Sequence, residues 1–302
     1  MRLALQAIAE ELRRLKNAGV KTVAVSDASV TALRATVARR QGTADKISDP
    51  SPAAAIKPSV AAATLAPKFP SPPPPAAQLP PPPTVALPDG DKRTRWDALQ
   101  ALVQNDATCR AHVRPGRKVV LGVGDLDAKI MFVGEAPGAE EEIQGEPFVG
   151  PAGQLLTKMI LGMGLKRAEV YIGNIMNWRP QLPTVEGRDQ VGNRPPIEEE
   201  LRYCLPYLRA QIEVVNPALL VALGSTAAQG LLGFKSFKAL GDVRGRWHEF
   251  GGKPLMITYH PSYILREPTN RKKRMIWDDL LKVMERAELP ISEKQRGFFL
   301  EK

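Results

Sequence analysis

Four short apolar runs alternate with amphipathic segments in the second part of the chain. The apolar runs have the length and composition of buried strands and occupy residues 129–133, 170–172, 219–223 and 255–258. Segments with helical spacing of apolar residues occupy 153–163, 197–215, 225–232 and 276–287. Alternation of this kind predicts an α/β fold, in which a mostly parallel four-stranded sheet is covered by helices on both faces.

Each expected strand runs directly into polar or glycine residues. In chain order these stretches are Gly134-Glu-Ala-Pro-Gly138, Gly173-Asn174, Gly224-Ser-Thr226 and Tyr259-His-Pro-Ser262. Open α/β sheets bind ligands at the carboxyl ends of their strands, so we expect all four stretches to meet at one site. Glycine permits close backbone approach at such a site, and proline stiffens the loop around it.

The first ninety residues are not expected to contribute to that core. Within 1–41, apolar residues Leu5, Ile8, Leu12 and Leu15 share one helical face, which predicts a short helix that docks an unknown partner or a second copy. Residues 42–90 are rich in proline and alanine and are expected to form a disordered linker, although an SH3-type ligand is an alternative. The globular domain is then 91–290, followed by a tail at 291–302. No run is long and apolar enough for a signal peptide or a membrane span, so we expect a cytoplasmic protein.

The charge of the chain and the charge of its most glycine-rich loop have opposite signs. Lys and Arg outnumber Asp and Glu by 42 to 32, a formal net charge of +10, which favours nucleic acid as a partner. Residues 134–153, however, hold five glutamates, five glycines, three prolines and no Lys or Arg. A surface built only to hold phosphate would not gather carboxylates, so this loop is a candidate for catalytic chemistry.

Several motifs together resemble the family-4 uracil-DNA glycosylases. These motifs are GEAPGAEEEIQGEPFVGPAGQLL from residue 134, YIGN at 171–174, VALG at 221–224 and TYHPS at 258–262. The similarity covers about residues 105–285. It implies a three-layer α/β/α sandwich and the hydrolysis of the N-glycosidic bond of uracil in DNA.

The resemblance implies how three side chains bind and activate the extruded base. Phe148 would stack on the flipped uracil, although a place in the core is the alternative. Asn174 would pair its amide with N3–H and O4 of uracil, which cytosine cannot match, and the alternative is a strand-terminating Asn. His260 would donate a hydrogen bond to O2, where negative charge grows as the base leaves.

The resemblance also implies the residues around the sugar. Gly134 and Ala136 are expected beside the base, and Glu135 and Glu141 are expected as catalytic carboxylates near the positive sugar. Other branches of the superfamily have an Asp at the position of Ala136. Activation of the water therefore falls to Glu135, Glu141 or a backbone carbonyl, and the sequence leaves this open. Some of Glu140, Glu142 and Glu146 are expected to be solvated loop charges.

DNA contacts are expected on two other segments. The start of the 225–232 helix at Ser225 can bind a phosphate through its backbone N–H groups. The residues after the histidine are expected to hold the duplex open and contact its backbone, with an apolar wedge among them: Ser262, Tyr263, Ile264, Leu265 and Arg266. A basic run at 271–274 suits phosphates by charge, although a solvated helix face is equally consistent with it.

The chain departs from the family at its iron–sulfur motif. The family pattern has four cysteines, whereas this chain keeps Cys109 and Cys204 and has Asp106 and Trp178 at the other two positions. Two thiolates do not meet the four-cysteine requirement, so we expect no metal and no 4Fe-4S cluster. Residues 181–192 look like an insertion, and they contain no histidine that could trap the DNA covalently.

These observations predict a monofunctional, monomeric uracil-DNA glycosylase of base-excision repair. It would act on single- or double-stranded uracil-containing DNA, associate with the nucleoid and leave an abasic site. The alternative is a superfamily member that binds uracil or damaged DNA with weak or no catalysis. A generic nucleotide-binding enzyme is disfavoured, because neither a G-x-G-x-x-G motif nor a Walker lysine follows the first strand.

Overall fold

A computed structural model describes residues 79–184 and 189–300 of the chain. The helix expected within 1–41 and the linker up to residue 78 lie outside the described residues. The strands are β1 (Val123–Gly124), β2 (Ile130–Gly134), β3 (Tyr171–Asn174), β4 (Leu219–Leu223), β5 (Trp247–Phe250) and β6 (Lys253–Thr258).

The central sheet has six strands in the order β1-β3-β2-β4-β6-β5, two more than the sequence predicted. The four expected strands form its parallel centre, in which β2 pairs with β3 and β4, and β4 pairs with β6. The two additional strands, β1 and β5, are antiparallel edges. Since the four central strands are parallel, their carboxyl ends lie at one edge, and Gly134 is in register with Asn174.

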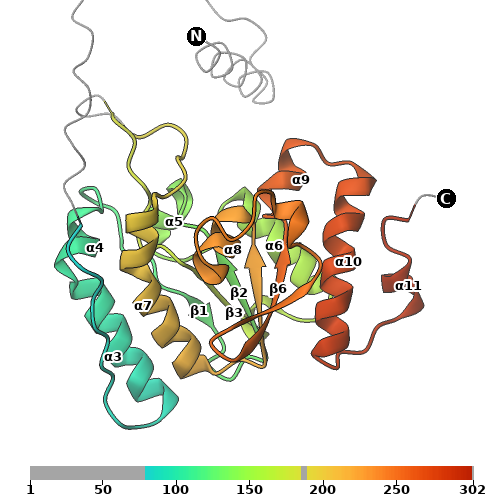
Figure 1. The fold of residues 1–302 in the computed structure, drawn as a ribbon, viewed down its shortest axis with the longest axis horizontal. Coiled ribbons are helices and arrows are strands. Elements are labelled where there is room, and N and C mark those ends of the chain that lie inside the picture. Colours follow the sequence, from blue (N-terminus) through green and yellow to red (C-terminus); the bar gives the residue numbers. More distant parts are fainter. Residues whose placement is uncertain (1–78, 185–188, 301–302) are drawn as a thin grey trace, which may run out of the picture. The chain divides into compact units, whose positions relative to one another are not determined.

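Helices cover both faces of this sheet (Figure 1). Residues that alternate along each strand enter two separate cores, as Phe132 and Met131 of β2 do. The core that contains Met131 packs against α3, α7 and α8, and the core that contains Phe132 packs against α6, α9 and α10. The architecture is therefore the expected α/β/α sandwich.

The helices begin and end where local chemistry favours it. Their bounds are α3 (Lys92–Asn105), α4 (Ala107–Ala111), α5 (Ala139–Gln144), α6 (Pro151–Gly162), α7 (Glu198–Val215), α8 (Ser225–Leu232), α9 (Ser262–Arg266), α10 (Asn270–Arg286) and α11 (Glu293–Arg296), with short 3₁₀ turns η1 (Arg167–Glu169) and η2 (Leu240–Asp242). The side chain of Asp91 caps α3, and that of Thr269 caps α10. Asn216 ends α7 in the left-handed conformation. None of the helices in the described ranges is both long and apolar enough to cross a bilayer.

Both ends of the described chain pack against the domain. Residues 79–88 have no regular structure, but Leu79, Val85 and Leu87 pack against the first core, which the expectation of a disordered linker did not include. The tail expected at 291–302 contains α11, and Phe298 packs against the second core. Apolar side chains in these segments explain the difference, because burying them favours attachment to the domain.

Candidate active site

A cavity of about 730 Å³ lies at the carboxyl ends of the four central strands. Expected site residues that line it are Glu135, Ala136, Glu141, Phe148, Asn174, Ser225, His260, Ser262 and Arg266. They come from loops after β2, β3, β4 and β6, so the convergence expected from the strand ends is present. Gly134, Tyr263 and Ile264 were also expected at the site but do not line the cavity.

Gly134 lies between two of the expected base-binding side chains. A Cβ at this position would come within 2.4 Å of both Asn174 Oδ1 and the Phe148 ring. The absence of a side chain therefore makes room for these two residues. Asn174 is buried, and its Oδ1 has no hydrogen-bond partner in the described part of the chain. A buried acceptor without a partner at a cavity wall indicates that a ligand donates to it.

Phe148 has a place in both the cavity and the core. Only 6% of its surface is exposed, and it packs in the second core while it also lines the cavity. Its φ is +55°, a strained value for a residue with a large side chain. A Cβ on Gly153 would lie 1.8 Å from the Phe148 carbonyl oxygen, so this backbone conformation needs a glycine at 153. Arg167 fixes the same loop by donating to the Pro147 carbonyl at 2.7 Å.

His260 is held in one tautomer beside Phe148. The backbone N–H of Ser262 donates to its Nδ1 at 3.2 Å, and the Ser262 hydroxyl lies 2.9 Å from the same nitrogen. Because a backbone N–H only donates, Nδ1 is the acceptor and the proton of the neutral ring is on Nε2. Burial, with a smaller contribution from the charge of Arg266, lowers the pKa of His260 to about 4. The ring is therefore a neutral donor, and its centroid lies 5.6 Å from that of Phe148.

Glu135 lines the cavity and has fewer hydrogen-bond partners than Glu141. Burial raises its pKa, and a hydrogen bond from the Thr226 side chain acts in the opposite direction. Thr226 belongs to the first turn of α8, whose N-terminus faces the cavity. The backbone carbonyl of Glu135 accepts the N–H of Met176, which continues the β2–β3 pairing and fixes the loop.

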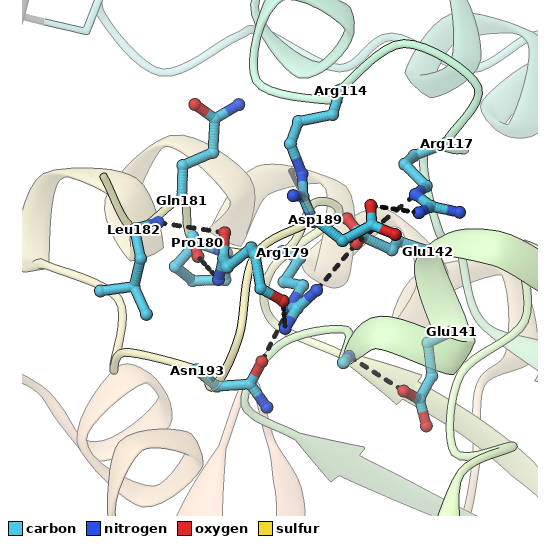
Figure 2. Close-up of polar contacts among 12 residues, drawn as sticks. Arg114, Arg117, Glu141, Glu142, Arg179, Pro180, Gln181, Leu182, Asp189 and Asn193 are labelled. Atoms are coloured by element: carbon cyan, nitrogen blue, oxygen red, sulfur yellow. Dashed lines mark hydrogen bonds and ion pairs between the residues drawn. The ribbon is translucent and has the colours of Figure 1, made fainter. Parts of the chain in front are cut away.

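Glu141 also lines the cavity, but both of its oxygens accept hydrogen bonds, one of which is drawn in Figure 2. One oxygen accepts the N–H of Gly138, and the other accepts the N–H groups of Val149 and Gly150, all at 3.0 Å. A single carboxylate thus joins the N-terminus of α5 to the N-terminus of α6 and to the residues that follow Phe148. This geometry suits a positioning residue better than the base that the sequence left possible.

Glu142 is buried, so it is not one of the solvated glutamates of this loop, whereas Glu140 is exposed. The Oε1 of Glu142 accepts from Arg114 at 2.6 Å and from Arg179 at 2.8 Å. Arg179 also donates through Nε to Oδ1 of Asn193 at 2.8 Å (Figure 2). Both Arg179 and Asn193 line the cavity, and neither was expected there. Their place beside Pro180 and Gly192 was the available signal, because polar residues next to Gly and Pro often mark functional loops.

The segment after the histidine differs from the expected wedge. Ile264 is 4% exposed and packs in the second core, so it is not available to DNA. Its neighbour Leu265 is 47% exposed and is the apolar side chain that α9 presents to solvent. The Tyr263 ring stacks on Tyr259 with centroids 4.3 Å apart, and Lys272 lies 4.6 Å above it. The contacts of Tyr263 with Tyr259 and Lys272 therefore hold α9 against the rest of the domain.

Most of the basic run at 271–274 has intramolecular partners. Lys272 pairs with Glu267, and Arg274 pairs with Asp278 at 2.7 Å. Lys273 lies 5.8 Å from the ring centroid of Phe299, and Arg271 is exposed. The run is thus mainly part of the packing of α10, and it offers less positive charge than its sequence suggests.

The residues at the family's cluster positions form a packed polar core. The Asp106 carboxylate accepts from Tyr207 at 2.9 Å and from the Cys109 N–H at 2.6 Å. Burial alone would raise the pKa of Asp106, but these hydrogen bonds outweigh it and the pKa is lowered. Trp178 is fully buried and stacks on His112 with centroids 4.8 Å apart. Burial raises the pKa of both cysteine thiols, and no group of three metal-ligating side chains occurs within 79–184 and 189–300. This donor set does not fit a four-thiolate cluster.

Comparison with known proteins connects this geometry to a family. The profile of the uracil DNA glycosylase superfamily matches residues 121–281. The type-4 uracil-DNA glycosylase of Thermotoga maritima is 40% identical over 181 residues, which cover 60% of this chain and 88% of the relative. That of Pyrobaculum aerophilum is 39% identical over 57% of this chain and 86% of the relative, and that of Archaeoglobus fulgidus is 38% identical over 59% and 88%. The chain belongs to the uracil DNA glycosylase superfamily, and within it to the type-4 family.

Proposed function

We propose that this protein is a uracil-DNA glycosylase of base-excision repair that flips uracil out of DNA and hydrolyses its N-glycosidic bond. One observation carries the proposal: an unpartnered amide oxygen, an aromatic ring, a neutral imidazole and a carboxylate surround one cavity. Relatives that match most of their own length are uracil-DNA glycosylases, which supports the same activity here.

Recognition of uracil is assigned to Asn174 and Phe148. The free Oδ1 of Asn174 accepts the N3–H of uracil, and its amide N–H donates to O4. Cytosine presents an acceptor at N3 and a donor at its exocyclic amine, so both contacts would become unfavourable. Phe148 stacks on the base. Hydrogen bonds from Arg167 and to Glu141 hold the loop that carries Phe148, so its ring is in place before the base binds.

Bond cleavage is assigned to His260 and Glu135. His260 Nε2–H donates to O2 as negative charge develops on the leaving base, and its low pKa keeps the ring neutral for this task. The Glu135 carboxylate stabilises the positive sugar and accepts a proton from the attacking water. Glu135 takes this role because the oxygens of Glu141 are engaged with backbone N–H groups.

Release of uracil from single- and double-stranded oligonucleotides tests the proposal. We expect the purified protein to release uracil and to leave an intact strand with an abasic site. The His260→Ala variant should lose about 2–4 kcal/mol of transition-state stabilisation with little change in DNA affinity. Specific binding to uracil-containing DNA without any release would instead support the alternative of a damage-binding protein that lacks catalysis.

We further propose that the protein works without an iron–sulfur cluster. Support comes from Trp178 and Asp106, which occupy two of the four ligand positions and are packed or hydrogen-bonded there. Iron and sulfide analysis, together with the visible absorption spectrum of protein purified without oxygen, tests this point. Stoichiometric iron would contradict it. Action as a monomer on nucleoid DNA in the cytoplasm stays a prediction, supported by a cavity that one chain completes.

A further inference from the structure

Four arginines lie at the cavity or next to it, and we name them the arginine rim. Its members are Arg114, Arg117, Arg179 and Arg194. Arg179 and Arg194 line the cavity, whereas Arg114 and Arg117 lie beside Arg179 around the Glu142 carboxylate. Three carboxylates face them. Glu142 contacts Arg114 and Arg179, Asp189 pairs with Arg117 at 2.7 Å, and Glu200 pairs with Arg194 at 2.6 Å. Among these seven groups one positive charge is in excess.

The three carboxylates differ in how firmly they are held. The side chains of Glu142 and Glu200 are 6% and 5% exposed, so their ion pairs are part of the interior. Asp189 is 77% exposed, and an ion pair at so exposed a position is weak because water and salt screen it. The Nε of Arg117 is also 3.9 Å from Glu142, too far for a hydrogen bond. Arg117 can therefore exchange Asp189 for another anion at little cost.

The rim is connected to the cavity by direct hydrogen bonds (Figure 2). Arg179 donates to Asn193 and to the Gly192 carbonyl, both at 2.8 Å, and all three residues line the cavity. Gln181 donates to the His112 carbonyl at 2.8 Å, which ties the segment after Arg179 to the segment that carries Arg117. Because Arg179 lines the cavity and shares Glu142 with Arg114, we expect a DNA strand whose base occupies the cavity to pass close to the arginine rim.

We infer that Arg117, with Arg114 beside it, binds a backbone phosphate of the DNA strand next to the extruded nucleotide, and that Asp189 occupies this position until DNA displaces it. The inference rests on the proposed function, because it takes DNA as the substrate. Arg117 donates one hydrogen bond to Asp189, through Nη2 at 2.7 Å, and a guanidinium can donate two parallel hydrogen bonds to a phosphate, so the exchange loses no contact of Arg117.

Opposite changes at the two partners give opposite expectations. Arg117→Gln should weaken DNA binding roughly tenfold at low salt and reduce the slope of log affinity against log salt by about 0.9 for duplex DNA. Asp189→Asn removes the competitor and should strengthen binding by up to about fivefold. Arg117→Lys should retain most of the salt slope, because the charge remains.

A matched control pair lies at the other end of the molecule. Arg93 and Asp97 form an exposed i,i+4 ion pair on α3. The neighbouring Lys92 contacts the carbonyls of Leu126 and Val215, which precede β2 and β4, so this pair is near the amino ends of the strands. Arg93→Gln and Asp97→Asn change the same charges as the test variants, and neither should alter DNA binding by more than about twofold.

Fluorescence anisotropy of a labelled duplex measures the DNA affinity of the full-length chain and its salt dependence. The titrations use duplexes with and without one uracil, at several salt concentrations. Uracil release under the same conditions should show a raised KM and an unchanged kcat for Arg117→Gln. An Arg117→Gln slope equal to that of Arg93→Gln, or weaker binding by Asp189→Asn, would refute the inference while uracil release by the wild type leaves the proposed function intact. If Arg117→Gln folds poorly, Asp189→Asn still tests the inference, because a substitution at the exposed Asp189 should not disturb folding. Absence of release by the wild type would instead refute the function.

Discussion

The sharpest test of the site separates two glutamates that the sequence could not distinguish. Glu141 and Glu135 both line the cavity, but their surroundings differ. Glu141 accepts hydrogen bonds from three backbone N–H groups at 3.0 Å. The pKa of Glu135 is raised by burial, and a hydrogen bond from the Thr226 side chain offsets only part of this effect. Replacement of each carboxylate by the amide of the same shape should therefore affect different properties.

Glu141→Gln should mainly reduce stability. The amide has one acceptor oxygen, so its NH₂ group must face at least one backbone N–H that Glu141 now accepts. An unsatisfied buried donor costs about 1–3 kcal/mol, and loss of the charge weakens the remaining hydrogen bonds. We expect a total loss of about 2–4 kcal/mol, equivalent to a Tm that is lower by roughly 5–15 °C for a domain of this size. The loop that carries Phe148 should loosen, so release slows, but the pH profile should keep its shape.

Glu135→Gln should mainly reduce catalysis. Removal of a general base lowers rates by about 10²–10⁴-fold, and removal of a partly buried charge whose pKa is raised by burial should leave stability unchanged or slightly higher. Single-turnover release at several pH values, together with thermal unfolding, measures both properties for the two variants. If Glu141→Gln keeps the wild-type Tm and loses the acidic limb of the pH profile, then Glu141 is the base and our reasoning about its hydrogen bonds is wrong.

Three further predictions concern the base-binding and catalytic groups. Release should fall as the pH drops through the raised pKa of Glu135, and this fall should precede protonation of His260 near pH 4; a flat profile for the wild type over this range would contradict the assignment. Asn174→Asp should permit cytosine excision or abolish uracil excision, as measured on matched U and C oligonucleotides. Unchanged selectivity would exclude recognition of the base by the Asn174 amide. Asp279 is buried and accepts from Arg244 and from the hydroxyl of Thr258, the last residue of β6, two residues before His260. Asp279→Asn should therefore lower kcat more than KM and should cost about 3–5 kcal/mol of stability by calorimetry, whereas a KM effect alone would argue against a positioning role.

The sequence was sufficient to place the site because the geometry of a parallel sheet determines which residues meet there. Once four parallel strands are recognised, the residues that follow them meet at one edge, and Glu135, Asn174, Ser225 and His260 do line one cavity. The edge strands were missed for a physical reason. β1 has only two residues, and β5 reads Trp-His-Glu-Phe with three of its four positions at least partly exposed, so neither carries a strong apolar signal.

The orientation of α9 could not be derived from its sequence. Its adjacent Ile264 and Leu265 are equally apolar, and a helix of five residues has too few positions to define a face. Burial of Ile264 and exposure of Leu265 depend on the packing of α9 against the second core, which involves residues distant in the sequence. Contacts of this kind are set by tertiary structure rather than by local pattern.

The three consecutive glutamates of α5 show the same limit and explain the acidic loop of a basic protein. Successive residues on a helix point about 100° apart, so Glu140 is exposed, Glu141 meets backbone N–H groups, and Glu142 meets arginines from remote segments. The two buried carboxylates are compensated by donors, and they hold the walls of the cavity in place. Glu135 lies outside this helix and has less compensation, so its carboxylate keeps the capacity to accept a proton. The density of acid in this loop therefore reflects two different uses, structural support by α5 and chemistry by the residue that follows β2.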